Sequence, residues 1–452
     1  MTAVDAQPGP AGVAGTGLRR VLSVPALVLF GLAYMVPLTV FTTYGIVNQI
    51  TDGRLPLAYI VTLVTMIFTT ISYGSMVRAY PVAGSAYAYA SRVFGPKAGF
   101  LSGWSLLLDY MLLPMINYLI IGIWLGQTFP AVPTWVFVLA AIILVTLLNL
   151  LGIVHVARAN MVIVGAQAVF IVVFVVMALL ALNSGTNFLA PFTGTGAGGI
   201  SPLFAGAAVL CLSFLGFDAV STLAEETKNA RRDVPRAILL VTLIAGALFV
   251  VLSYLSYLVL PTTNFHNVDS ASLEVMAKLG GDFLVAFFTA AFVAGSFGSA
   301  VASQASVSRI LYSMGREGVL PRAVFGRLSV KGAVPVLSIL VVAVVSLLAL
   351  VTSLDVVASM ISFGALVAFS VVNLAVIRHY LFVERRRGAK SMIVYGAVPT
   401  IGFLLTAWLW TSLSQVALTV GLGWVAVGII ILAITTRGFR KASPSWQMDE
   451  AL

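Results

Sequence analysis

The chain has 452 residues, of which 60% are hydrophobic and only 9% are charged, and its mean hydropathy is +1.07. Soluble globular proteins carry about 25% charged residues, so this composition argues against a soluble enzyme, a nucleic-acid-binding domain or a disordered scaffold. The single cysteine, Cys211, excludes an internal disulfide, and three histidines are too few for a metal cluster. The formal net charge of +10 has to be interpreted from where the basic residues lie.

Long apolar stretches follow one another along almost the whole chain, separated by polar residues, Gly or Pro. A helix needs about 20 apolar residues to cross a bilayer, and tilt or bilayer thinning accommodates shorter stretches. Twelve membrane spans are predicted, at 23–49, 57–76, 99–126, 134–151, 159–182, 201–224, 236–260, 283–311, 336–352, 356–382, 392–412 and 416–436. The polar, Gly- and Pro-rich residues 1–20 do not resemble a signal peptide and are expected to form a disordered tail.

The basic residues mark one side of these spans. If the N-terminus is cytoplasmic, all of the 25 Lys and Arg residues except Arg54 and Lys278 lie in or beside cytoplasmic segments. The positive-inside rule requires this asymmetry, so both termini are predicted to be cytoplasmic. The net charge then reflects the topology, with the lipid bilayer as the partner and no nucleic acid.

Two acids lie deep in predicted spans, Asp109 in the third and Asp218 in the sixth, and Glu225 lies near the inner end of the sixth. No Lys or Arg lies well inside any predicted span. A carboxylate at mid-bilayer costs at least ~2.5 kcal/mol and usually pairs or serves a function. The partners that remain are a proton, a metal ion or a cationic ligand. The alternative is a protonated Asp that hydrogen-bonds to nearby backbone.

Helical spacing places several polar residues on common faces. The sixth span carries Phe214, Asp218, Ser221, Thr222 and Glu225 on one face, and the third carries Asp109, Leu113, Ile116 and Asn117. The eighth span has a hydroxyl stripe of Ser296, Ser299, Ser303 and Ser306. Small residues at this spacing serve close helix packing, and oxygen ligands for an ion are the alternative.

Two spans contain helix breakers at corresponding positions. Pro37 lies near the middle of the first span, between Gly31 and Gly45, and must interrupt its hydrogen-bond ladder. The sixth span, five spans later, contains Gly206 and Gly216. Interrupted segments at matching places in two halves are the best sequence indication of a transporter's central site.

Longer motifs resemble the amino acid–polyamine–organocation superfamily of transporters. RAYPVAGSAYAYASRVFGPKAGFLSGWSLLLDY (Arg78–Tyr110) is similar to its loop between spans 2 and 3. SFLGFDAVSTLAEETKNARRDVPRAI (Ser213–Ile238) is similar to its span 6 and the following loop. ASQASVSRILYSMGREGVLPRAVFGRL (Ala302–Leu328) is similar to the end of its span 8. Within the superfamily, GLAYMVPLTVFTTYGIV, LLDYMLLPMIN and FLGFDAVSTLAEET look most like bacterial putrescine importers, and the likeness extends from about Val21 to Ile434.

The resemblance implies an all-α protein of the bacterial inner membrane with twelve transmembrane helices, in which helices 1 and 6 are broken. Helices 1–5 (21–200) and 6–10 (201–390) would form a five-plus-five inverted repeat. Helices 11 and 12 (391–436) would be peripheral and followed by a cytoplasmic tail (437–452). Substrate would bind between the broken helices, lined by spans 3, 8 and 10, without any cofactor, metal site or catalytic residue.

The resemblance also implies site residues. Those that would bind substrate are Pro37, Leu38, Thr39 and Thr42 in span 1, Asp109 and Tyr110 in span 3, Phe214, Gly216, Phe217 and Asp218 in span 6, and Ser299 in span 8. Those that would couple a proton or ion are Asp218, Glu225 and Ser303. Two departures stand out. Thr42 replaces an acid of the putrescine importers, and Gln167 occupies the part of span 5 where proton-coupled relatives carry a Lys.

We therefore expect a transporter, not an enzyme, that imports a cationic amine such as putrescine by alternating access. Asp218 would hold one ammonium, with Phe214, Phe217 and Tyr110 as an aromatic wall that adds roughly 0.5–2 kcal/mol. The alternative is an amino-acid:proton symporter or exchanger, with the substrate carboxylate against the span 1 amides near Pro37–Thr39. A membrane-embedded enzyme or receptor is disfavoured because no catalytic constellation lies within a span. The coupling ion, proton or sodium, and the oligomeric state stay open.

Overall fold

The structure is a computed structural model that describes residues 22–81, 85–151, 156–193, 199–316, 320–327 and 335–438. Throughout this part of the chain the regular elements are helices, and the one β-type contact is an isolated bridge between Leu22 and Thr227. The predicted tail at 1–20 lies outside the described residues, as does the predicted tail at 437–452 except for its first two residues.

Twenty-four helical elements follow one another in the described residues. The first half of the chain contains α1 (Val24–Met35), η1 (Pro37–Phe41), α2 (Tyr44–Ile50), α3 (Leu55–Ala79), α4 (Ser85–Phe94), α5 (Pro96–Thr128), α6 (Thr134–Leu151), α7 (Val156–Ala181) and α8 (Ala190–Thr193). The second half contains α9 (Ser201–Leu210), η2 (Cys211–Phe214), η3 (Asp218–Glu226), α10 (Ala230–Val259), η4 (Val268–Ser270), α11 (Ala271–Arg316), α12 (Arg322–Phe325), α13 (Val336–Ser346), η5 (Leu347–Leu350), α14 (Leu354–Ile377), η6 (Arg378–Val383), α15 (Ala389–Met392), η7 (Ile393–Ala397), α16 (Val398–Thr411) and α17 (Gln415–Thr435).

Ten helical segments among the described residues are long and apolar enough to cross a membrane. They fall on ten of the predicted spans. The other two predicted spans, 159–182 and 336–352, coincide with the shorter apolar helices Gly165–Ala181 and Val336–Leu350. The chain is therefore an all-helical, multi-pass membrane protein, as its composition predicts.

Two segments add detail to the sequence expectation. The element α11 (Ala271–Arg316) is kinked at Gly280 and Gly281, where the backbone is non-helical, so the helix that follows the kink begins close to the predicted start of span 8 at 283. Two consecutive glycines lower helix propensity enough to allow this kink. The segment Ser85–Phe94, expected to be a loop, forms the helix α4.

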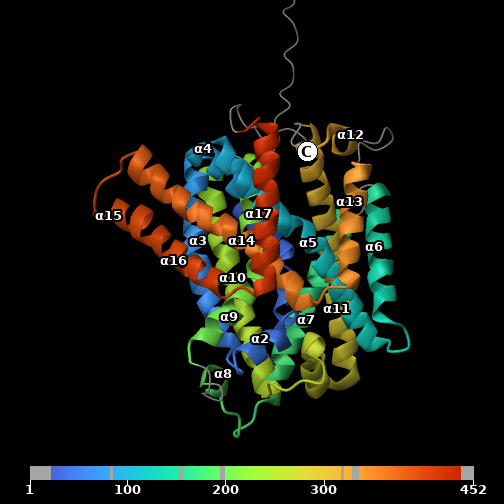
Figure 1. The fold of residues 1–452 in the computed structure, drawn as a ribbon. Coiled ribbons are helices and arrows are strands. Elements are labelled where there is room, and N and C mark those ends of the chain that lie inside the picture. The colour runs from blue at the N-terminus through green and yellow to red at the C-terminus, as the bar shows by residue number, and fades with distance from the viewer. Residues whose placement is uncertain are drawn as a thin grey trace, which may run out of the picture.

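The long helix α5 packs against more of its neighbours than most of the other helices do. It packs against α4, α6, α11, α14 and α17, while α3 packs along α10 and α14 also contacts α16. In Figure 1, α6 and α13 lie along one edge of the bundle, and α15 and α16 project from the opposite edge. The core therefore lies around α5, and the helices with the most exposed apolar surface surround it.

Buried polar side chains tie the helices around α5 together. Gln304 of α11 is fully buried. Its Nε2 donates to Thr146 Oγ1 at 3.1 Å, and its Oε1 accepts hydrogen bonds from Asn149 Nδ2 at 3.2 Å and Tyr118 OH at 3.4 Å. Polar side chains that hydrogen-bond across helices hold membrane bundles together where hydrophobic association is weak. This network joins α5, α6 and α11 on one side of the molecule.

Candidate functional site

The first span is broken just before Pro37. The helix α1 ends at Met35, and Val36 adopts φ 49° and ψ 94°, a conformation that interrupts the helix. Because Pro has no N–H, the chain continues from Pro37 as the short 3₁₀ helix η1. The hydroxyl of Thr39 lies 2.8 Å from the carbonyl oxygen of Met35 and 2.6 Å from that of Val36. It therefore satisfies backbone acceptors that the break frees.

The sixth span is broken around Gly216. The chain leaves η2 through an extended Leu215, passes Gly216 at φ +118°, and re-enters a helix at Asp218. An L-residue rarely adopts this φ. Asp218 Oδ1 accepts a hydrogen bond of 3.3 Å from the Gly216 N–H, so this carboxylate also holds the unwound turn.

The two breaks are in direct contact. A Cβ on Gly216 would lie 2.6 Å from Tyr34 Cδ1 and 3.3 Å from the Met35 backbone nitrogen. Only a residue without a side chain allows the two unwound segments to approach this closely. The matching helix breakers in the sequence therefore mark segments that meet in space.

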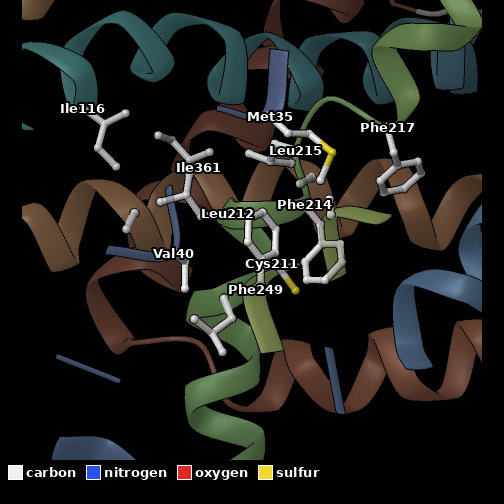
Figure 2. Packing of buried hydrophobic residues seen from close by; sticks show 14 of the residues in the cluster. Met35, Val40, Ile116, Cys211, Leu212, Phe214, Leu215, Phe217, Phe249 and Ile361 are labelled. Carbon is white, nitrogen blue, oxygen red and sulfur yellow. The ribbon is translucent and has the colours of Figure 1, made fainter. Parts of the chain in front are cut away.

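A pocket lies beside this contact and encloses about 470 Å³ of empty space, part of it open to solvent. Four elements form it: the broken first span, α5, the end of η2, and α11. Its lining residues are Tyr34, Met35, Val36, Thr39, Thr42, Leu113, Ile116, Asn117, Ile120, Leu212, Leu215, Phe292, Ser296 and Ser299. In Figure 2, the lining residues Met35, Leu212 and Leu215 lie close together at the breaks, whereas Ile116 lies farther to the left, beyond Ile361. Among these lining residues there is no Asp, Glu, Lys or Arg.

One side of the pocket is polar and uncharged. Asn117 Nδ2 donates to Ser299 Oγ at 3.1 Å and to the Leu113 carbonyl at 2.9 Å, which joins α5 to α11. The hydroxyl of Thr42 is buried and has no hydrogen-bond partner in the described residues, and the Thr42 residue is 2% exposed. An unsatisfied buried polar group costs about 1–3 kcal/mol. A ligand that bonds to this hydroxyl would recover part of that cost.

Both deep acids lie near the Tyr34 end of the pocket, although neither lines it. Asp109 and Asp218 are each 7% exposed. Asp218 is held beside the Tyr34 ring through its hydrogen bond to the Gly216 N–H, and Asp109 lies one helical turn before the lining residue Leu113 on α5. The Asp109 carboxylate makes no hydrogen bond or ion pair with any residue that the structure describes. Gly364 of α14 leaves space beside it, since a Cβ there would lie 3.1 Å from Asp109 Cβ.

Of the three aromatic residues that were predicted to form a wall of the site, one lies near the two acids and two lie in the core. Tyr110 is partly exposed and lies within electrostatic range of Tyr34 and both acids. In contrast, Phe214 and Phe217 are fully buried and do not line the pocket. Phe214 packs edge-on against Phe249 at 5.4 Å. Phe217 packs against Tyr73 at 5.5 Å and Phe369 at 5.2 Å, so in this conformation both rings fill the core between helices.

The other predicted site residues are distributed as follows. Pro37 is partly buried and Leu38 is fully buried at the start of η1, next to the lining residues. Ser303 lies one turn from Ser299 and donates to the Ser299 carbonyl at 2.7 Å. The side chain of Glu225 lies outside the described part of the structure, although its backbone belongs to η3.

Several lining residues were not predicted to be site residues. Asn117 had a recognisable signal, because it follows Asp109 and Leu113 at helical spacing and is polar within an apolar span. Ser296 belonged to the predicted hydroxyl stripe. The contribution of Leu212 and Leu215 had no signal, because one apolar residue in a membrane span looks like any other.

The site offers binding groups and no reactive centre. No group of three His, Cys, Asp or Glu among the described residues is placed to hold a metal ion. The arrangement combines negative charge at one end, apolar walls, and neutral donors and acceptors at the other end. It is suited to hold a small organic molecule at the centre of a helical membrane bundle.

Comparisons with known proteins identify the family of the chain. Residues 26–436 match the family model described as amino acid permease. The chain is 40% identical over 440 residues to the low-affinity putrescine importer PlaP of Escherichia coli (strain K12), covering 95% of this chain and 96% of the relative. It is 26% identical over 458 residues to the branched-chain amino acid permease BcaP of Bacillus subtilis (strain 168), covering 94% of each. It is 24% identical over 444 residues to the methylthioribose transporter of the same organism, covering 93% of this chain and 94% of the relative. The chain therefore belongs to the amino acid permease family, within the amino acid–polyamine–organocation superfamily of membrane transporters.

Proposed function

We propose that this protein imports a small cationic amine, putrescine or a related amine, across the bacterial inner membrane by alternating access. The observation that carries the proposal is the position of Asp109 and Asp218 at the Tyr34 end of the pocket, beside the contact between the two broken helices. Carboxylates inside a membrane protein mark substrate or ion paths. An ammonium that loses its hydration there needs a carboxylate at close range.

The relatives support the same substrate class. PlaP, with 40% identity over nearly its whole length, is a putrescine importer. The likeness covers both broken helices and the segments that carry Asp109 and Asp218 in this chain. Full-length coverage supports a common architecture as well as a common site.

The architecture that we propose has twelve membrane helices with both termini in the cytoplasm. Helices 1–5 and 6–10 form two inverted repeats, and helices 11 and 12 are peripheral. This assignment treats the shorter helices Gly165–Ala181 and Val336–Leu350 as the fifth and ninth spans. It is supported by the position of the breaks, five spans apart, and by the basic residues on the inner side.

Transport requires the site to open to each side in turn. The broken helices would move with their neighbours α3 and α10 against a scaffold of α5, α6, α11 and α13. The extensive packing of α3 on α10 supports the first group, and the Gln304 network supports the second. The contact of Gly216 with Tyr34 lies where such a movement would bend each broken helix.

The coupling of transport to an ion gradient would depend on the same two acids, Asp109 and Asp218. Two nearby carboxylates repel each other, so either an ammonium or a proton between them lowers the energy of the site. Asp218 is the proposed coupling residue, together with Glu225 at the inner end of η3 and Ser303 beneath Ser299. Proton and sodium are both candidate ions.

The test is uptake of radiolabelled putrescine into proteoliposomes that contain the purified full-length protein. Competition by putrescine, butylamine, arginine and leucine would define the substrate class, and collapse of either the proton or the sodium gradient would identify the coupling ion. We expect competition by amines and little by leucine. Absence of putrescine uptake above that of protein-free liposomes, or inhibition of that uptake by leucine as strong as that by unlabelled putrescine, would overturn the proposal.

The second candidate is an amino-acid symporter or exchanger. The apolar wall of Ile116, Ile120 and Leu212 favours it, because such a wall would also hold a branched aliphatic side chain. The relative BcaP is a branched-chain amino acid permease. Leucine uptake in the same proteoliposomes would separate the two functions.

A further inference from the structure

The two ends of the pocket differ in charge. Both acids lie toward Tyr34: Asp218 Oδ1 accepts a hydrogen bond from the Gly216 N–H beside the Tyr34 ring, and Asp109 lies one helical turn before the lining residue Leu113 on α5. Asn117 lies eight residues after Asp109 on α5, which corresponds to about 12 Å along a helix that rises 1.5 Å per residue. Asn117 is hydrogen-bonded to Ser299 of α11, and the polar groups that line the pocket beyond Tyr34, which are Thr39, Thr42, Asn117, Ser296 and Ser299, are all neutral.

The hydrogen-bonding capacity of the neutral end is only partly used. The Asn117 amide nitrogen bonds to Leu113 O and Ser299 Oγ, whereas its Oδ1 accepts nothing from the described residues. Ser299 Oγ accepts that bond, so its own hydroxyl hydrogen is available to donate. The buried hydroxyl of Thr42 has no partner there at all. The neutral end therefore offers both hydrogen-bond donors and hydrogen-bond acceptors to a ligand.

An ammonium is poorly suited to this end. It offers three donors and no acceptor, and the carboxylate of Asp109, about 12 Å away along α5, is too far from Asn117 to compensate for its lost hydration. A hydroxyl or an amide both donates and accepts, so it can satisfy Asn117 Oδ1 and the Ser299 or Thr42 hydroxyl together. An alkyl end would leave all these groups unsatisfied.

We propose that the pocket is selective for amines with a single ammonium and a neutral hydrogen-bonding group about four carbons away, in preference to diamines charged at both ends. This inference rests on the proposed function, because the charged end is the one assigned there to Asp109 and Asp218. It adds Asn117 and Ser299, with Thr42, as the groups that determine the nature of the second end of the substrate.

The experiment compares competitors of radiolabelled putrescine uptake in proteoliposomes: unlabelled putrescine, 4-amino-1-butanol, butylamine and 1,4-butanediol. These molecules share a four-carbon chain and differ only in their ends. We expect 4-amino-1-butanol to inhibit at about fivefold lower concentration than putrescine or butylamine, the factor that one net hydrogen bond supplies. Butanediol, which has no ammonium, should not compete.

Three variants test which residues determine the preference among these competitors. Asn117→Asp places a carboxylate at the neutral end with almost no change in shape, and it should reverse the preference in favour of putrescine. Thr42→Val removes one hydroxyl and should reduce the advantage of the amino alcohol over butylamine. The matched control is Thr62→Val on α3, whose hydroxyl bonds to the Ala58 carbonyl at 2.9 Å outside the pocket lining, and it should leave the order of competitors unchanged.

The outcomes separate the two proposals. If putrescine inhibits better than 4-amino-1-butanol in the wild type, or if Asn117→Asp and Thr42→Val both leave the order unchanged, this inference is wrong and amine import stands. If the proteoliposomes take up no radiolabelled putrescine, the proposed function is wrong and this inference is wrong with it. Size-exclusion profiles of the variants show whether each one is folded.

Discussion

Gly216 and Tyr34 meet where the unwound parts of two membrane helices touch, and a Cβ on Gly216 would lie 2.6 Å from the Tyr34 ring. Gly216 also has φ +118°, which other residues rarely adopt. This one position therefore combines a backbone requirement with a steric requirement. Gly216 therefore brings the unwound part of the sixth span into contact with that of the first span.

Gly216→Ala is expected to reduce uptake strongly. The positive φ alone costs an L-residue about 1–3 kcal/mol, and the contact with Tyr34 forces the two breaks apart. Initial uptake rates in proteoliposomes should fall by at least about tenfold, which corresponds to 1.4 kcal/mol. Gly423→Ala in α17 is the control, because nothing lies within 4 Å of its Cβ position. Wild-type uptake by Gly216→Ala would show that the close approach of the two breaks is dispensable.

The Gln304 network is expected to stabilise the scaffold. Gln304→Leu leaves the buried groups of Thr146, Asn149 and Tyr118 without this partner, and each buried group left unsatisfied costs about 1–3 kcal/mol. We expect a lower melting temperature in detergent with the affinity for substrate largely retained. The control Gln415→Leu alters an exposed residue at the start of α17.

A Gln304→Leu protein that is as thermostable as the wild type would contradict the scaffold role. A weaker affinity at unchanged stability would also contradict it, and would place Gln304 in the binding machinery.

The topology is testable with introduced cysteines. Cys211 is fully buried, so the native chain should react poorly with a membrane-impermeant maleimide. Asn264→Cys, in the exposed segment between α10 and η4, should react from outside intact cells. Arg387→Cys, in the exposed segment before α15, should react only after permeabilisation. The opposite pattern would reverse the proposed orientation.

The sequence predicted the breaks better than it predicted the residues around them. Pro37 and Gly216 are visible in the sequence because each has a backbone property that a continuous helix cannot accommodate. The break itself begins at Val36, a β-branched residue with a positive φ. Its position is expected, because a helix usually ends at or before the residue that precedes a proline, whereas a positive φ at a β-branched residue is rare and could not be predicted.

Side-chain direction was the harder part to predict. Phe214 and Phe217 share the unwound region with Asp218, yet their rings point into the core against Phe249 and Phe369. Helical periodicity does not apply across a break, so the faces calculated for the sixth span were unreliable beyond it. On the unbroken α5 the same periodicity correctly grouped Leu113, Ile116 and Asn117, which all line the pocket.

The most direct test of the account is the KM for putrescine uptake in Asp109→Asn and Asp218→Asn proteins. Each change preserves shape and removes one negative charge, with Asp282→Asn, an exposed acid of α11, as the control. Truncating one member of a buried charge pair costs about 2–5 kcal/mol, so the account predicts that KM rises by at least about tenfold in both variants and is unchanged in the control. An unchanged KM in both folded variants would contradict the claim that these two carboxylates hold a cationic amine.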